Sequence, residues 1–290
     1  MWRVAIFVVL FLFLSFVLQG WTRWLGLDDR FPSGALGIRI AGFLLAALGA
    51  SWFVMRRLEG SSLAALGLPW GARSGMGFGF GFAFGALIIG SAVVALAAAG
   101  WVSWVPDAAG SGPPAMTPLG VSGALAAGAV AEELLFRGYP LQVLAESMGG
   151  PPAIALTAGL FGVLHGANPH VGPLPLINVT LAGVLLGTAY WRTYSLWVVS
   201  GIHFGWNWVM GVAAAFPVSG LDVSPPGRAI QLHGPALWTG GDFGPEGGLA
   251  VTLISLAGWW WLARTPLLSR DERVVELGPL PDRRRSAESR

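Results

Sequence analysis

Long apolar runs alternate along the whole chain with short segments that are polar or rich in Pro and Gly. An apolar helix needs roughly 17–25 residues to span a bilayer. Eight runs reach or approach that length, and the pattern predicts a helix for each: 2–18, 35–55, 76–99, 119–144, 153–166, 174–191, 196–216 and 248–263. The fifth run is short and the eighth is marginal. The pattern therefore predicts an all-α, polytopic transmembrane helical bundle of about eight spans.

Composition agrees with this class of protein. The 290 residues are 54% hydrophobic and 11% charged, whereas soluble domains carry about 25% charged residues. Fifteen Trp and 43 Gly suit helices that pack closely within lipid. The formal charge of +2 gives no reason to expect a nucleic-acid partner. The apolar composition makes membrane lipid the expected surrounding. The absence of cysteine excludes disulfides, thiolate catalysis and cysteine metal sites.

Arginine, the only basic side chain besides histidine, predicts the orientation. No small-residue cleavage pattern follows the first run, which is therefore expected to remain as a helix. With eight spans, most arginines outside the spans fall on one side, which the positive-inside rule assigns to the cytoplasm. Arg228 is an exception, and Arg23 and Arg30 are offset by Asp28 and Asp29. Both termini are expected in the cytoplasm, with a bacterial cytoplasmic membrane as the location.

Two segments need a choice between structures. Phe alternates with Gly or Ala over 76–85, as in a strand, but an isolated strand would leave its backbone unpaired in lipid. A helix is therefore predicted, with Gly77, Gly81 and Gly85 in a stripe for close helix contact. The segments 107–118 and 217–247 are rich in Pro and Gly and are predicted to be extramembrane loops.

Three short strings place ionisable side chains inside apolar spans, where such groups are costly and usually functional. They are Glu132-Glu-Leu-Leu-Phe-Arg137, Phe161-Gly-Val-Leu-His165 and His203-Phe-Gly-Trp-Asn207. In a helix, Glu133 and Arg137 are four residues apart and can form an ion pair. Glu132 then points elsewhere and is free for chemistry. The alternative is that both glutamates belong to one buried network with Arg137.

The remaining polar groups allow more than one interpretation. His203 and Asn207 share a helix face and could stabilise an oxyanion together, or could instead hydrogen-bond between helices. His165 ends its apolar run and alone would fit an interfacial position. The hydroxyls of Thr180, Ser195 and Ser200 are interpreted as helix-packing groups. His170 and His233 lie in predicted loops and receive no role.

Two mechanisms fit the polar set. In one, Glu132 and His165 activate a water that attacks an amide carbonyl, and His203 with Asn207 stabilises the oxyanion. In the other, Glu132, His165 and His203 bind a divalent metal that activates the water. The chain lacks the H-E-x-x-H pattern that puts two histidine ligands on one helix, which weakens the second mechanism.

The ordered strings resemble the E-E-x-x-x-R, F-x-x-x-H and H-x-x-x-N motifs of the CPBP family, over about 119–216. This family contains intramembrane glutamic endopeptidases of the CAAX prenyl protease, or Rce1, type and bacterial homologues linked to bacteriocin processing or immunity. The resemblance implies a protease that needs no metal or other cofactor. It implies Glu132 and His165 as the water-activating groups, His203 and Asn207 as the oxyanion site, and Glu133–Arg137 as a supporting ion pair.

The resemblance also bears on the expected substrate and on how the chain divides into segments. Family members in eukaryotes cleave prenylated C-a-a-X proteins. For a bacterial chain, the expected substrate is a membrane-associated or lipophilic peptide or protein. Neither its prenylation nor the oligomeric state of the protein is assigned. Residues 1–118 are expected to form N-terminal spans, 119–216 the catalytic core, and 217–290 a loop, a last span and a charged cytoplasmic tail. A non-catalytic immunity or scaffold protein of this fold and a proton-relay transporter remain alternatives.

Overall fold

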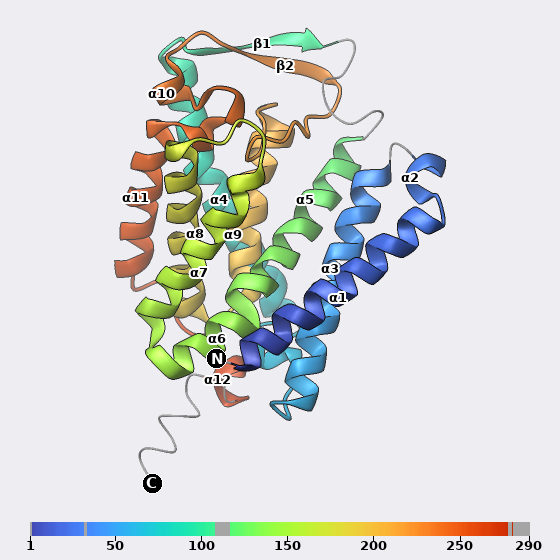
Figure 1. The fold of residues 1–290 in the computed structure, drawn as a ribbon. Coiled ribbons are helices and arrows are strands. Elements are labelled where there is room, and N and C mark those ends of the chain that lie inside the picture. The colour runs from blue at the N-terminus through green and yellow to red at the C-terminus, as the bar shows by residue number, and fades with distance from the viewer. Residues whose placement is uncertain (1, 32–33, 108–116, 278–279, 281–290) are drawn as a thin grey trace.

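The computed structural model describes residues 2–31, 34–107, 117–277 and 280, and helices dominate it (Figure 1). The prediction of an all-α membrane bundle is confirmed. The helices are α1 (Trp2–Trp24), α2 (Leu27–Arg30), α3 (Ala35–Arg57), α4 (Ala72–Ala98), α5 (Pro118–Glu133), α6 (Tyr139–Met148), α7 (Gly150–Leu164), α8 (Pro173–Thr193), α9 (Leu196–Trp208), α10 (Ala236–Thr239), α11 (Leu249–Arg264) and α12 (Glu272–Glu276).

Five stretches among the described residues are long and apolar enough to cross a membrane: α1, α3, α4, the continuous stretch Pro118–Met148, and α8. The other three predicted spans are helical but shorter. α7 has 15 residues and α11 has 16, while α9 has 13 and continues into a π-helical turn at Val209–Ala213. The chain is therefore a polytopic membrane protein whose shorter helices pack among longer ones.

Local sequence explains where two of the site helices begin. The Thr117 side chain caps α5 by accepting a hydrogen bond from the Gly120 amide, and Pro118 occupies the first turn. Ser195 caps α9 by accepting from the Val198 amide. The hydroxyl of Ser195, interpreted above as a packing group, thus fixes the start of the helix that carries His203 and Asn207.

Glycines allow α4 and α9 to pack backbone against backbone. A Cβ added at Gly81 or Gly85 of α4 would overlap a carbonyl oxygen of α9, and Gly201 and Gly205 of α9 face the α4 backbone in the same way. Small residues at such spacing let membrane helices approach closely. The predicted helix over 76–85 and its glycine stripe are confirmed, and the stripe holds α9 in place.

A two-stranded antiparallel sheet lies at one end of the bundle, far from the N-terminus and α12 (Figure 1). β1 (Val102–Asp107) pairs with β2 (Gly227–Leu232). The predicted loop 217–247 therefore has more structure than expected: it contains β2, α10 and the 3₁₀ turns Gly241–Phe243 and Pro245–Gly247. Residues 108–116 of the other predicted loop lie outside the described residues.

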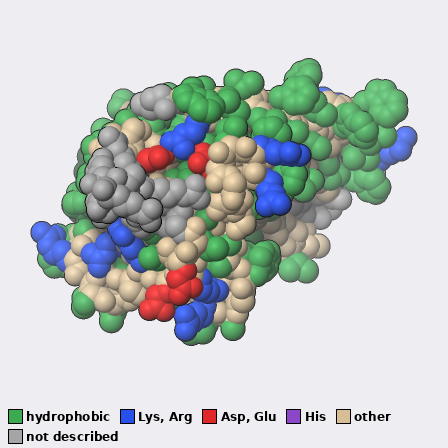
Figure 2. Space-filling model, turned by 90° about the horizontal axis from the view of Figure 1, so that it is seen from below, with side chains coloured by type: hydrophobic (Ala, Val, Ile, Leu, Met, Phe, Trp, Pro, Cys, Tyr) green, Lys and Arg blue, Asp and Glu red, His purple; other side chains and the backbone are tan. Residues whose placement is uncertain are grey.

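Arginine side chains gather on the opposite end, which includes the N-terminus and α12 (Figure 2). Arg3 pairs there with Glu59 at 3.1 Å and also with Glu146. Arg192 donates to the carbonyl oxygens of Ala263 and Thr265, at 2.8 and 2.6 Å. Arg3 and Arg192, which the eight-span interpretation places on one side of the membrane, thus lie at the same end of the bundle. Arg283–Arg285 lie outside the described residues.

Candidate active site

Glu133 and Arg137 form a buried ion pair where α5 gives way to a π-helical turn, Leu134–Gly138. Arg137 Nη1 donates to Glu133 Oε1 at 2.9 Å, and both side chains are fully buried. Arg137 Nη2 donates to the Gly183 carbonyl oxygen of α8 at 3.1 Å, and the guanidinium lies 4.6 Å from the centre of the Phe161 ring. Turns of this kind inside helices often occur at functional sites.

His203 joins this ion pair from α9. Its Nδ1 donates to Glu133 Oε1 at 2.8 Å, across 70 residues of sequence. Glu133 therefore does more than neutralise Arg137, because it also fixes the orientation of the His203 ring. That orientation brings His203 Nε2 to 3.8 Å from Glu132 Oε2. Helix spacing predicted the contact between Glu133 and Arg137, but it could not predict the contacts of His203 with the two glutamates.

Glu132 faces a cavity. Its side chain is 30% exposed, yet its Oε2 atom is buried and accepts no hydrogen bond from any described residue. The cavity encloses about 950 Å³, part of it open to the surroundings, and its wall includes Glu132, His165, His203 and Asn207. Buried carboxylate oxygens are normally hydrogen-bonded, so this oxygen is suited to a ligand or water. Glu133 Oε2 and Arg137 Nε also lack partners among the described residues, but both side chains are fully buried.

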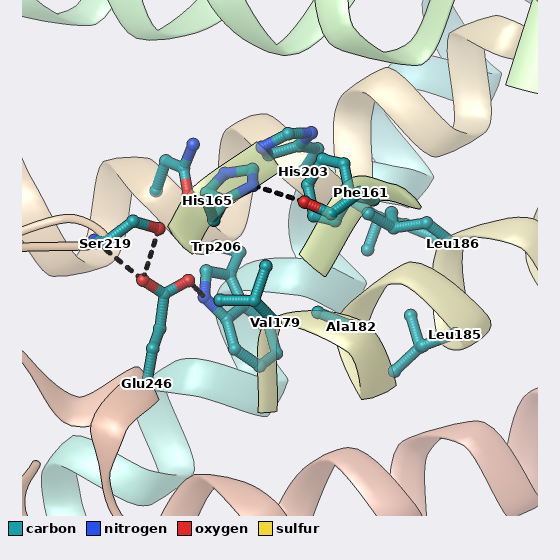
Figure 3. A pocket seen from close by; sticks show the side chains of 12 residues that line it. Phe161, His165, Val179, Ala182, Leu185, Leu186, His203, Trp206, Ser219 and Glu246 are labelled. Carbon is teal, nitrogen blue, oxygen red and sulfur yellow. Dashed lines mark hydrogen bonds between the residues drawn. The ribbon is translucent and has the colours of Figure 1, made fainter. Parts of the chain in front are cut away.

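His165 lies in the 3₁₀ turn His165–Ala167, directly after α7. Its Nδ1 is 2.8 Å from the Phe161 carbonyl oxygen, which can only accept, so Nδ1 carries the hydrogen (Figure 3). Nε2 is then the ring nitrogen that can accept a proton. Among the described residues His165 makes no direct hydrogen bond with Glu132, although both line the same cavity.

Asn207 lies one helical turn beyond His203 on α9 and is half-buried. It lines the large cavity and also a neighbouring, smaller pocket of about 440 Å³. Within the described part of the chain, its amide has no hydrogen-bond partner. The smaller pocket is mostly apolar, and its wall also includes Phe161, Val179, Leu185 and Leu186.

Two polar residues of this pocket were missed by sequence reasoning: Glu246 and Ser219. They come from the segment that was predicted to be a plain loop, and no motif spacing relates them to the three strings. The one glutamate of a Pro- and Gly-rich stretch, next to a membrane span, was the only available signal.

The other histidines and hydroxyls lie apart from these cavities or serve the helices. His233 Nε2 is 2.7 Å from Ser103 Oγ at the two-stranded sheet. Thr180 donates to the Leu176 carbonyl oxygen within α8, at 2.8 Å. Within the described residues, no three His, Asp or Glu side chains are grouped in a way that could hold a metal ion.

The comparison with protein families gives one match. Residues 114–209 match the family described as type II CAAX prenyl endopeptidase Rce1-like, and this range contains all three motifs. No curated protein and no solved structure matches the chain. The match covers the helices α5 to α9, of which α5 and α9 line the cavity together with the turn that follows α7. The segment 114–209 is therefore similar to the CPBP, or Rce1-type, family of membrane proteases.

Proposed function

We propose that this protein is an intramembrane endopeptidase in which Glu132 and His165 activate a water for attack on a peptide carbonyl. The proposal depends above all on one observation: Glu132 lines a cavity that His165, His203 and Asn207 also line, and its Oε2 accepts no hydrogen bond from any described residue. A carboxylate and an imidazole that share a water can divide its proton and hydrogen bonds between them. His165 offers Nε2 for this purpose, because Nδ1 is engaged with Phe161.

His203 and Asn207 would stabilise the oxyanion that forms after attack. The Asn207 amide has two N–H donors, and donors arranged before the reaction lower the barrier most. His203 donates from Nε2 when both ring nitrogens carry hydrogen, since Nδ1 already donates to Glu133. Glu133 and Arg137 take no part in bond making and hold His203 in position.

The substrate we propose is a membrane-associated or lipophilic peptide or protein. Apolar side chains of α3 and α5, such as Ile40, Phe43 and Leu125, line much of the large cavity. Such a wall accepts aliphatic or aromatic substrate groups by removing them from water. Cleavage assays on paired prenylated and unprenylated peptides test whether a prenyl group is among these substrate groups.

We further propose that both termini face the cytoplasm and that the cavity opens toward the opposite side. Val218, Leu221 and Val223 line the cavity and belong to the segment that leads into β2, at the end remote from the arginine-rich face. The chain has no cysteine, so single substitutions can be labelled cleanly. Asp242→Cys should react with a membrane-impermeant maleimide in intact cells, and Ser62→Cys only after the cells are opened. The reverse labelling would overturn this orientation.

The test of the reaction uses purified protein in liposomes with a library of hydrophobic peptides. Wild type should cleave at least one peptide, and Glu132→Ala should abolish cleavage while the melting temperature stays unchanged. Full cleavage by this variant would refute the role of Glu132.

Strong chelation separates the metal-free mechanism from the metal-dependent one. If a chelator abolishes cleavage and a divalent metal restores it, the metal-dependent mechanism replaces the proposed one. If the cellular phenotype of wild type persists in both Glu132→Ala and His203→Ala, the protein is instead a non-catalytic member of this fold.

A further inference from the structure

Glu246 is a third carboxylate at the site, and it is buried. It lies in the turn Pro245–Gly247, outside the residues that match the protease family. Only 7% of the residue is exposed, and it borders the smaller pocket together with His165, His203 and Asn207 (Figure 3). Nothing in the three motifs gives this residue a role.

Protein donors occupy both oxygens of this carboxylate. The Trp206 indole Nε1 donates to Oε1 at 2.9 Å. The backbone amide and the hydroxyl of Ser219 both donate to Oε2 at 2.7 Å (Figure 3). A carboxylate offers about four lone-pair sites, and three are used here. Glu246 thus has little capacity left for a water or a substrate, which distinguishes it from Glu132.

Those hydrogen bonds connect the two halves of the site. Trp206 lies on α9 directly before Asn207, and one turn after His203. Ser219 in turn accepts a hydrogen bond at its carbonyl oxygen from Asn168 Nδ2, at 2.9 Å. Asn168 directly follows the turn that contains His165. The carboxylate of Glu246 therefore links the helix that carries His203 and Asn207 to the turn that carries His165.

Backbone conformation at Ser219 supports this role. Ser219 has φ 49°, in the left-handed region that residues other than glycine rarely adopt. Such conformations persist only where the surroundings hold them, and they cluster at functional sites. Glu246 supplies two of the holding contacts. Its own backbone is fixed from α8, because Asn178 Nδ2 donates to the Glu246 carbonyl oxygen at 2.7 Å.

We propose that Glu246 is a positioning residue that sets the distance between His165 and the His203–Asn207 pair. The proposal rests on the proposed protease function for its kinetic consequence, but its structural consequence can be measured without any substrate. Glu246 would act through Trp206 and Ser219, and it would not touch the scissile bond.

The kinetic test compares Glu246→Ala and Glu246→Gln with Asp242→Asn, which removes an exposed carboxylate from the same segment. Misplacement of catalytic groups by about 1 Å can cost roughly 100-fold in rate. Glu246→Ala should lower kcat about 10- to 100-fold with KM within about twofold of wild type. Glu246→Gln should be intermediate, because a single amide oxygen can accept from Trp206 or from the Ser219 amide but not from both. Asp242→Asn should match wild type. A wild-type kcat in folded Glu246→Ala would overturn the proposal.

Hydrogen exchange followed by mass spectrometry gives the structural test. In Glu246→Ala, peptides covering 165–169 and 217–221 should exchange at least about tenfold faster, while α4 and α8 keep their protection. Trp206→Phe, which removes the indole N–H donor and keeps an aromatic ring, replaces Glu246→Ala if that variant does not fold. Unchanged exchange at both peptides, or equal acceleration throughout the bundle, would contradict a positioning role. Absence of cleavage by wild type would count against the protease function and leave this exchange result standing.

Discussion

Glu132 and Glu133 are neighbours in the chain, yet they belong to two regions with opposite properties. Glu133 is fully buried and accepts hydrogen bonds from Arg137 and His203 through one oxygen. Glu132 borders a cavity, and its Oε2 has no hydrogen-bond partner among the described residues. Adjacent helical positions point about 100° apart, so one turn can serve a closed network and an open cavity at once. In the proposed mechanism, the network holds the site together and the cavity side performs the chemistry.

The largest effect on stability should come from breaking the closed network. Arg137→Ala leaves Glu133 as an uncompensated charge in the protein interior, which typically costs about 3–5 kcal/mol. Denaturation in mild detergent should show this loss together with loss of cleavage. Arg73→Ala is the matched control, because Arg73 pairs with Glu272 at 3.9 Å with both side chains largely exposed. Equal stability of the two variants would remove the distinction between a supporting network and ordinary surface charge.

On the cavity side, Asn207→Ala should impair the reaction without affecting the fold. Loss of one oxyanion donor costs about 10²- to 10³-fold in kcat, or roughly 3–4 kcal/mol. The melting temperature should stay at the wild-type value, since no described residue depends on this amide for a hydrogen bond. A lower melting temperature with normal kcat would show that Asn207 joins helices and does not serve the reaction.

The α4–α9 contact offers a way to disturb both regions from a distance. Gly81→Ala places a methyl group against the α9 backbone and must push the helices apart. Such overpacking costs about 1–3 kcal/mol, and it should lower kcat because α9 carries His203 and Asn207. Gly79→Ala, on the open side of the same helix, meets nothing within 4 Å and should leave both quantities unchanged. Equal behaviour of the two alanine variants would contradict the packing argument.

The smallest effect is expected at Asp271, in the tail outside the membrane. The side-chain hydrogen bonds from Arg273 hold the pKa of Asp271 below its ordinary value of 3.8. A carboxyl group with a lowered pKa stabilises the fold at pH values above the ordinary pKa, and this contribution disappears as the pH falls through the folded-state pKa. Asp271→Asn should therefore lower the melting temperature slightly at pH 6, and this difference from wild type should shrink as the pH falls below 3.8 toward the folded-state pKa. A difference that grows on acidification would have the wrong sign.

Sequence reasoning succeeded where the relevant contact is local. Apolar run lengths predicted the helices, four-residue spacing predicted the Glu133–Arg137 contact, and the glycine stripe predicted the close approach of α4. It could not predict that His203 contacts Glu133, because that contact depends on how α5 and α9 pack. Glu246 and Ser219 were missed for the same reason: their contacts with Trp206 and with each other join segments separated by 27 to 40 residues. The pairing of β1 with β2 also joins distant segments and was not predicted.

The central claim is that Glu132 is the chemical carboxylate and Glu133 the structural one, and a parallel measurement on Glu132→Gln and Glu133→Gln tests it most directly. Both variants keep the side-chain size and remove the charge, and each is assayed for peptide cleavage and melting temperature in one preparation. Glu132→Gln should melt like wild type and lose cleavage about 10²- to 10⁴-fold, the usual contribution of a general base. Glu133→Gln should melt at a clearly lower temperature, because Arg137 is then buried without a counter-charge. Wild-type cleavage by Glu132→Gln, or equal destabilisation by the two substitutions, would contradict the account.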